Sequence, residues 1–267
     1  MSAAPHAVTP SSDWRRPLRY LWRFPALLLL VVVGLPITML MINPLCAKLS
    51  RRGERLDHWA VRQWQGGLVR AFGMRTKRYG TPLPGAAMFV ANHVSWIDIS
   101  VLHSLRWMGF VAKAEIERWP LIGWLASRGG TIYHHRGNNE SLHGVMHQMV
   151  QRLESGLAVG VFPEGRTTDG RGIGVFHARI FQPAVLAKVP AQPVAVKYGA
   201  KGNAQAIVAF GPREHFMGNF LRLLGEPGRV VEVHFLEPVA ASEDGRRRMA
   251  DTCRERIAAA MSNGVES

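Results

Sequence analysis

A cluster of reactive side chains follows a short apolar run. The run AAMFV, residues 86–90, is typical of a buried strand and leads into NHVSWIDIS at 92–100. His93 and Asp98 lie five positions apart in this stretch. If a helix begins at Ser95, Asp98 lies in its first turn and can accept a hydrogen bond from one imidazole nitrogen of His93. The other nitrogen would then serve as a general base toward a substrate hydroxyl.

The same residues have a purely structural interpretation. Ser95 followed three positions later by Asp98 resembles a capping box, which marks a helix N-terminus. In that interpretation the two side chains stabilise the first turn and His93 has no function. The stretch alone leaves both interpretations open.

A second group of polar residues lies in LAVGVFPEGRTTDG, residues 157–170. An apolar strand is predicted to end at its Pro-Glu-Gly turn, and ligands of open α/β sheets bind beyond the carboxyl ends of strands. Arg166 is suited to hold an anionic oxygen through two hydrogen bonds, and Glu164 to orient that arginine or a substrate hydroxyl. A surface loop with a Glu–Arg pair is the alternative.

The elements that would position these residues alternate along the chain. The alternation indicates an α/β fold with a mixed, mostly parallel sheet flanked by helices. Strands are expected near 86–90, 108–112, 130–133, 157–162, 192–198, 205–210 and 229–236. Helices are expected over 54–73, 95–105, 120–128, 139–154, 177–188, 214–224 and 243–262. The expected organisation is a disordered N-terminus (1–17), membrane-embedding and interfacial helices (18–75) and a catalytic domain (76–267).

The segment from Phe24 to Ala47 carries no charge over 24 residues. About 20 apolar residues suffice to cross a bilayer as a helix. Four basic residues lie on each side of the segment, so the flanks do not select an orientation. Gly34 and Pro36 are suited to a break in mid-segment, and a re-entrant hairpin is therefore as consistent with the sequence as a span. A buried core helix is the third interpretation.

The formal net charge of +14 predicts an anionic partner. The basic flanks of the apolar segment suit anionic headgroups, so membrane phospholipids are expected as partners and nucleic acid is not. Cys46 and Cys253 are the two cysteines, and we expect both to be reduced thiols. His143 and His147 are four apart on a predicted helix but lack an evident third ligand, so no metal is expected.

The two reactive stretches, in this order, resemble the glycerolipid acyltransferase family, whose best-known bacterial members acylate lysophosphatidic acid. The resemblance covers about residues 80–210 and includes four blocks in order. The first contains Asn92, His93, Ser95 and Asp98, the third is FPEG (162–165) and the fourth is VPAQPVAV (189–196). The second, GTIYHHR (130–136), ends in Arg136 and follows a Lys-x-Glu segment, Lys113 to Glu115, with Pro120 and Gly123.

The resemblance implies a mechanism and a set of partners. His93 would deprotonate the free hydroxyl of a lysophospholipid acceptor while Asp98 holds the imidazole. The alkoxide would attack an acyl thioester on coenzyme A or acyl carrier protein, without an acyl-enzyme and without a cofactor. The polar headgroup would be bound by Arg136, Glu164, Gly165 and Arg166. The expected location is a bacterial inner membrane with the catalytic domain facing the cytoplasm, where thioester donors are found.

The first hypothesis for the acceptor is 1-acyl-glycerol 3-phosphate, which would give phosphatidic acid. Three departures from the family pattern concern headgroup contacts. Arg166 directly follows Gly165 where many members have threonine, His134 and His135 replace a common Ile-Asp, and His177 stands where a lysine is expected. Another lysolipid, such as lyso-ornithine lipid, therefore remains open as acceptor. A non-catalytic, basic, membrane-anchored protein that binds lipid or nucleic acid is a further alternative.

Overall fold

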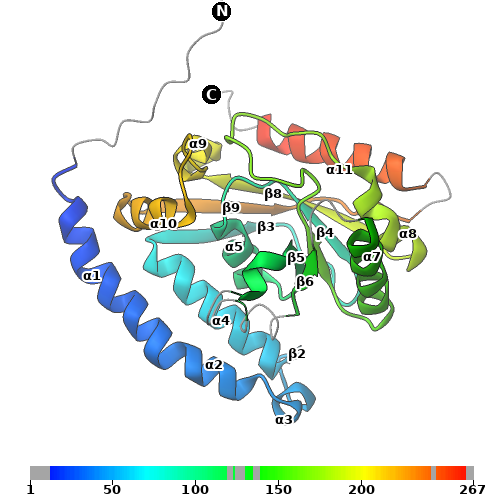
Figure 1. Ribbon diagram of the computed structural model, residues 1–267, viewed down its shortest axis with the longest axis horizontal. Helices are drawn as coiled ribbons and strands as arrows, with labels where there is room; N and C mark the ends of the chain where they lie inside the picture. Colours follow the sequence, from blue (N-terminus) through cyan, green and yellow to red (C-terminus); the bar gives the residue numbers. More distant parts are fainter. Residues whose placement is uncertain (1–12, 119–122, 124–129, 135–138, 242–244, 263–267) are drawn as a thin grey trace, which may run out of the picture.

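The fold is built on one seven-stranded sheet (Figure 1). The computed structural model describes residues 13–118, 123, 130–134, 139–241 and 245–262. The strand order is β3-β9-β8-β4-β7-β5-β6. Strands β8, β4, β7, β5 and β6 run parallel to one another, while β9 and β3 run antiparallel to them. The strand bounds are β3 (Met74–Tyr79), β4 (Met88–Ala91), β5 (Gly109–Lys113), β6 (Ile132–His134), β7 (Val159–Val161), β8 (Ala191–Tyr198) and β9 (Arg229–Phe235). The expected mixed, mostly parallel sheet is confirmed.

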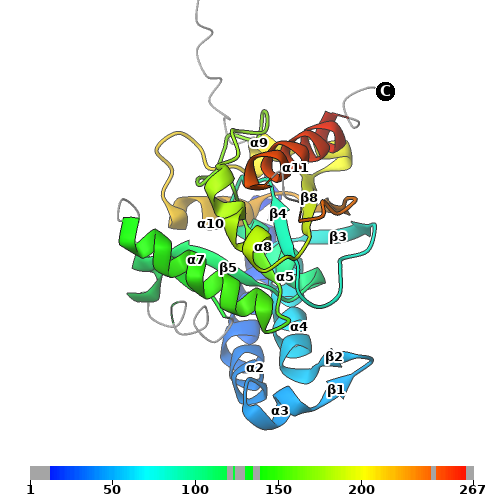
Figure 2. The same cartoon turned by 90° about the vertical axis from the view of Figure 1, so that its right-hand side faces the viewer.

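Helices cover both faces of this sheet (Figures 1 and 2). Along β4, Phe89 and Ala91 belong to one hydrophobic cluster, and Met88 and Val90 belong to the other. Since successive strand residues point to opposite faces, each face has its own core. The first core is packed by α4 (Leu56–Ala71), α5 (Ile97–Leu105) and α10 (Phe216–Gly225). The second is packed by α7 (Asn139–Glu154), α8 (Gln182–Leu186) and α11 (Gly245–Ser262). All residues of β4 and β8 are buried, as expected for strands covered on both faces.

Two sequence-based assignments of strands need correction. Residues 205–208 form the short helix α9 (Gln205–Val208), so the strand expected at 205–210 is wrong. The Gln205 side chain accepts a hydrogen bond from Tyr198 N at 2.8 Å and donates one to Val196 O at 2.9 Å. The side-chain amide of Gln205 thus forms hydrogen bonds with the end of β8 that the backbone of a neighbouring strand would otherwise form. The second correction is β3, a charged edge strand that the apolar pattern missed; only its first residue, Met74, is buried.

The remaining short elements are 3₁₀ turns and a hairpin. They are η2 (Ala114–Arg118), η3 (Ala178–Phe181), η4 (Ala200–Gly202) and the pair β1 (Ser50–Arg51) and β2 (Glu54–Arg55). The helix expected at 120–128 lies outside the described residues except for Gly123.

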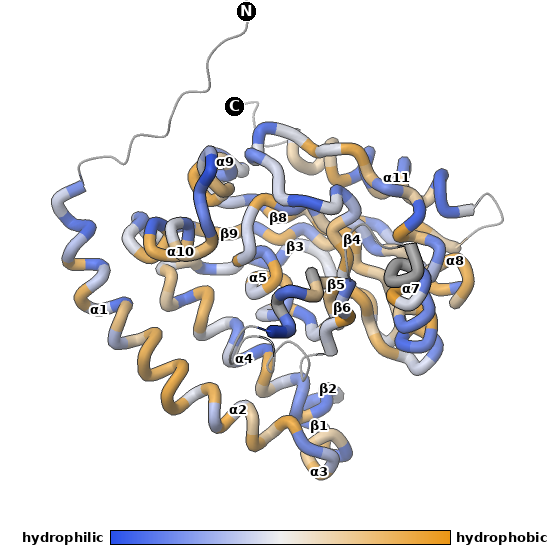
Figure 3. The backbone as a smooth tube through the Cα atoms, in the orientation of Figure 1, coloured by the Kyte–Doolittle hydropathy of each residue, from blue (hydrophilic) through white to orange (hydrophobic). Residues whose placement is uncertain are grey.

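The N-terminal apolar segment forms one long helix. It runs through α1 (Arg16–Leu29), the π-helical turn η1 (Leu30–Gly34) and α2 (Leu35–Met41). It is long and apolar enough to cross a membrane, and 17% of its most apolar stretch is buried within the protein. A core helix would be mostly buried, so this surface is free to contact lipid. In Figure 3 hydrophobic residues line much of α1 and α2. Helix α1 begins at Arg16, inside the range 1–17 that was expected to be a disordered N-terminus.

The helix does not break at Gly34 and Pro36. In the π-helical turn, Leu35 N–H bonds to Leu30 O, so the hydrogen-bond ladder widens just before the proline, which has no N–H to donate. The chain turns instead at Asn43, whose side chain accepts from Leu45 N and Cys46 N and starts α3 (Pro44–Lys48).

Helix α4 returns along the apolar helix and joins it to the domain. It packs against α2 on one side and α5 on the other. Trp64 Nε1 donates to Leu30 O at 3.1 Å, the same carbonyl that accepts from Leu35 N–H in the π-helical turn. The N-terminal helix is therefore attached to the helix layer that carries the first reactive stretch.

Candidate active site

Adjacent parallel strands bring the two reactive stretches together. Strands β4 and β7 pair in register, with Val90 opposite Val161. Because both strands run in the same direction, the residues that follow them meet at one edge of the sheet. His93 N donates to Glu164 Oε1 at 3.0 Å, across 71 positions of sequence.

At this edge His93 and Asp98 form a hydrogen-bonded pair. His93 Nδ1 lies 2.8 Å from Asp98 Oδ2. The same oxygen accepts from Val94 N at 2.7 Å and Ser95 N at 2.9 Å. An ionised carboxylate only accepts hydrogen bonds, so the proton of the His–Asp contact resides on Nδ1. Nε2 of a neutral His93 then carries a lone pair, as a general base requires.

Asp98 also has the structural role that the capping interpretation gives it. Asp98 bonds back to Ser95 N, as the acidic member of a capping box does. Ser95 does not complete the motif, because its hydroxyl donates to Asn219 Oδ1 at 3.3 Å and α5 begins only at Ile97. The carboxylate therefore fixes the first turn of α5 and orients the His93 ring at once.

The plane of the His93 ring is fixed by stacking. The ring lies on Phe162, with centroids 3.9 Å apart and planes 15° apart. Phe162 in turn stacks on Phe110 at 5.4 Å. The Asp98 side chain is fully buried, whereas 16% of the His93 side chain is exposed. Nε2 makes no hydrogen bond to the described residues, so it is available to a ligand arriving from outside.

Glu164 holds the loop that follows β7 against His93. Its second oxygen, Oε2, accepts from Gly174 N at 2.7 Å. The side chain is buried, and burial raises its pKa despite the two backbone N–H groups. The loop is further attached by Thr168, whose N–H donates to His93 O at 2.8 Å. Both carboxylate oxygens of Glu164 are thus used inside the protein, so the geometry favours a role in positioning His93 over direct contact with a headgroup.

Comparison with known proteins identifies the family. A family model described as Acyltransferase matches residues 76–197. The lyso-ornithine lipid O-acyltransferase of Pseudomonas aeruginosa is 33% identical over 248 residues, which cover 91% of this chain and 94% of that protein. The 1-acyl-sn-glycerol-3-phosphate acyltransferase of Neisseria gonorrhoeae is 32% identical over 126 residues, 47% of this chain and 49% of that protein. The chain belongs to the glycerolipid acyltransferase family.

The fold of this acyltransferase is also that of a solved structure. The 1-acyl-sn-glycerophosphate (LPA) acyltransferase of Thermotoga maritima superimposes with a TM-score of 0.68 at 17% identity, over 91% of this chain and 95% of that chain. At this identity the similarity concerns the fold alone.

The other site residues expected from the sequence do not all lie in the described part of this acyltransferase. Gly165 has a φ of +69°, a left-handed conformation that favours glycine, and its backbone turns the chain directly after Glu164. Arg166 is exposed on the same loop. Arg136, the end of the second block, lies outside the described residues. His143 and His147 are hydrogen-bonded to Arg179 and Gln151, and no group of three potential metal ligands occurs in the described part of the chain.

Tyr198 is a site residue that sequence reasoning missed. Its hydroxyl donates to Asp98 Oδ1 at 2.5 Å, and both residues are fully buried. Burial, followed by the adjacent Asp98, raises the Tyr198 pKa well above its usual value, so the phenol stays protonated and donating. One signal could have revealed it: Tyr198 ends β8, the neighbour of β4, and so reaches the edge where β4 delivers His93.

Proposed function

We propose that this acyltransferase moves a fatty acyl group from a thioester donor to the free hydroxyl of a lysolipid, with His93 as general base and Asp98 as the residue that orients it. The observation that carries the proposal is the 2.8 Å contact between His93 Nδ1 and Asp98 Oδ2, with Nε2 left open at the strand edge. The described residues of the site contain a base held in one orientation but no serine or cysteine hydrogen-bonded to it. A substrate hydroxyl is the group that fits that place.

The reaction balances with these residues alone. His93 Nε2 takes the proton of the acceptor hydroxyl while its oxygen attacks the thioester carbonyl carbon. The tetrahedral intermediate collapses with cleavage of the C–S bond, and the thiolate leaves with the proton returned from Nε2. The products are an ester and a free thiol. Asp98 stabilises the imidazolium that forms between the two steps.

For the acceptor we favour lyso-ornithine lipid, which reverses the order of the two hypotheses drawn from sequence. The support is the length of the similarity: the Pseudomonas aeruginosa relative aligns over 91% of this chain, whereas the Neisseria gonorrhoeae relative aligns over 47%. Ornithine presents a carboxylate and an ammonium group. The loop over His93 carries side chains of both signs in Asp169 and Arg171, which are exposed.

1-Acyl-glycerol 3-phosphate is the second candidate. It is supported by the shorter matches to enzymes of that name and by the exposed cation Arg166, which suits a phosphate. For either acceptor, the exposed apolar helix Arg16–Met41 would keep the enzyme at the bilayer where a lysolipid resides. We place the domain at the cytoplasmic face of a bacterial inner membrane, because coenzyme A and acyl carrier protein thioesters are cytoplasmic.

The test combines one variant with an acceptor panel. His93→Ala is expected to reduce acyl transfer by about 10²–10⁴-fold, the usual contribution of a general base. Circular dichroism and vesicle flotation should match the wild type. His147→Ala, an exposed histidine on α7, is the matched control and should keep full activity. Near-normal transfer by His93→Ala would refute the mechanism.

The panel pairs lyso-ornithine lipid and 1-acyl-glycerol 3-phosphate with acyl-coenzyme A and acyl carrier protein donors. We expect a higher kcat/KM for lyso-ornithine lipid. A preference for the phosphate lipid would transfer the assignment to the second candidate and leave the role of His93 unaffected.

A further inference from the structure

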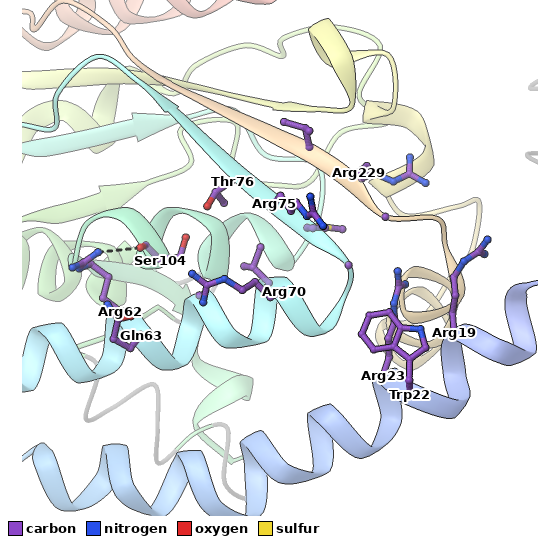
Figure 4. Close-up of a pocket in the computed structure, with 16 residues that line it drawn as sticks. Arg19, Trp22, Arg23, Arg62, Gln63, Arg70, Arg75, Thr76, Ser104 and Arg229 are labelled. Atoms are coloured by element: carbon purple, nitrogen blue, oxygen red, sulfur yellow. Dashed lines mark hydrogen bonds between the residues drawn. The ribbon is translucent and has the colours of Figure 1, made fainter.

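A basic hollow lies between the apolar helix and the sheet. It has a volume of about 990 Å³ and is lined by residues of α1 and α4 and by the first residues of β3 and β9 (Figure 4). Neither His93 nor Asp98 lines it, and none of the described residues that line it carries a carboxylate. Six arginines do: Arg19, Arg23, Arg62, Arg70, Arg75 and Arg229. We refer to this hollow as the arginine pocket.

Part of the cluster has a structural explanation. Arg19 donates to Gly225 O at 2.7 Å, and Arg23 donates to Leu224 O at 2.8 Å and Glu226 O at 2.7 Å. Both arginines thus satisfy carbonyls at the C-terminal end of α10, where cations are favourable. These hydrogen bonds explain why α1 packs against α10, but carbonyl groups do not neutralise the positive charge of the two arginines.

The charge of the arginine pocket is only half compensated. Arg19 pairs with Asp13 at 2.5 Å, Arg62 with Glu54 at 3.0 Å and Arg229 with Glu226 at 2.9 Å. Across the described part of the chain, no carboxylate forms an ion pair with the remaining three, which are Arg23, Arg70 and Arg75. Arg70 and Arg75 are exposed, and Figure 4 shows them on neighbouring elements, α4 and β3.

Arg23 gives the strongest indication that the arginine pocket binds an anion. Its side chain is 2% exposed, and its Nε atom is buried without a hydrogen-bond partner. Gly73 makes room for it, since a side chain at that position would overlap the guanidinium group. A buried guanidinium group that forms no ion pair with the described residues is costly, and an anion bound nearby would offset that cost.

The position of the arginine pocket indicates which anion reaches it. Arg19, Trp22 and Arg23 occupy the turn before Phe24, where the uncharged segment begins. Trp22 is 53% exposed and Phe24 60% exposed. Tryptophan and arginine beside an apolar helix lie at headgroup depth when that helix is embedded. Phosphate is the anion of that layer, and arginine binds its oxygens with two parallel hydrogen bonds.

We propose that the arginine pocket is a binding site for the phosphate group of an anionic membrane phospholipid, separate from the site of acyl transfer. The phosphates of a coenzyme A donor share this chemistry, so the test must separate the two sources. The proposal goes beyond the catalytic function and does not depend on it, because His93→Ala should bind the phospholipid as tightly as the wild type.

Binding is measured by titration calorimetry on the full-length protein in neutral detergent. The probes are short-chain phosphatidylglycerol, short-chain phosphatidylcholine, coenzyme A and dephospho-coenzyme A. We expect saturable binding of phosphatidylglycerol at one molecule per chain and no saturable binding of phosphatidylcholine. Saturable binding of coenzyme A alone, lost in the pocket variant, would support a phosphate site and overturn its assignment to lipid. The absence of saturable binding for all four probes would overturn the proposal.

The pocket variant is Arg70→Gln with Arg75→Gln. These two side chains make no hydrogen bond or ion pair to the described residues, so the fold should tolerate their replacement. The matched control is Lys188→Gln with Arg247→Gln, which removes the same charge from exposed positions near α8 and on α11. We expect the pocket variant to bind phosphatidylglycerol about tenfold or more weakly, since each cation near anionic lipid contributes several-fold, and the control to bind within about twofold of the wild type. Equal losses in both variants would indicate diffuse charge attraction and refute a built site.

Discussion

Replacing Tyr198 by phenylalanine removes one hydroxyl from the buried centre of the proposed site. The ring keeps its volume, so the change isolates the hydrogen bond from the packing. Asp98 Oδ2 accepts from three donors, but Oδ1 has Tyr198 as its only hydrogen-bond partner within the described structure. In the Tyr198→Phe variant that oxygen is buried without a donor.

The magnitude follows from the burial and the charge. A hydrogen bond to a charged group contributes about 1.5–3 kcal/mol, and an oxygen left without its donor incurs a cost of this order. We therefore expect the free energy of unfolding to fall by about 1.5–3 kcal/mol. The Asp98 carboxylate, without its Tyr198 hydrogen bond, also holds the His93 ring less firmly. Since the base must be oriented toward the acceptor hydroxyl, kcat/KM for acyl transfer should fall as well, by about tenfold.

The assay is release of the free thiol at neutral pH, with wild type, Tyr198→Phe and a control compared at saturating donor. The control is Tyr79→Phe, which removes a phenol from the sheet at a position 43% exposed and stacked on His234. Denaturant unfolding supplies the stability. An unchanged kcat/KM in Tyr198→Phe, or the same loss in Tyr79→Phe, would refute the idea that the phenol acts through Asp98.

Two further predictions concern the supports of the site. Asn92 Oδ1 accepts from Val196 N at 2.8 Å, and its Nδ2 donates to Val196 O at 3.1 Å. Asn92→Ala should therefore lower the free energy of unfolding by about 1–3 kcal/mol, as measured by denaturant titration. A loss below about 0.5 kcal/mol would contradict this. The Arg222 hydrogen bond lowers the pKa of Glu214 from 4.5 to about 2, so the stability it contributes is fully present above pH 4.5 and is lost as pH falls toward 2. Glu214→Gln should therefore be less stable than wild type at neutral pH, with the difference shrinking over that acidic window, and a difference independent of pH would contradict the assignment.

The sequence was informative where one physical pattern dominated. The apolar runs that became β4, β7 and β8 are buried on both faces, so their composition alone marks them as strands. Helix α7 was predicted over its observed range, 139–154, because its apolar residues recur at helical spacing. Strand β3 was missed because MRTKRY lies at the edge of the sheet, where one buried residue suffices.

The site was predictable in its reactive residues and less so in their supports. His93 and Asp98 are close in sequence, and a single helical turn brings them together. Tyr198 lies 100 positions from Asp98, and its contact depends on β8 pairing with β4, which no local pattern encodes. Glu164 was expected to contact a headgroup, and this stays a prediction; no local pattern indicates that its two oxygens accept from His93 N and from Gly174 N, ten residues further along a loop.

The reversal of β9 and β3 brings the candidate active site and the arginine pocket to one edge of the sheet. Strands β7, β4 and β8 end there, which delivers Glu164, His93 and Tyr198. Because β9 runs antiparallel to β8, with Val231 opposite Tyr198, it begins at the same edge, and β3 begins beside it, with Met74 opposite Arg229. The arginine pocket forms around those two strand starts, and α1 closes it just before the uncharged segment. An all-parallel sheet would have placed these starts at the far end, away from His93. The mixed topology therefore brings the proposed phospholipid site to the same edge of the sheet as the proposed general base.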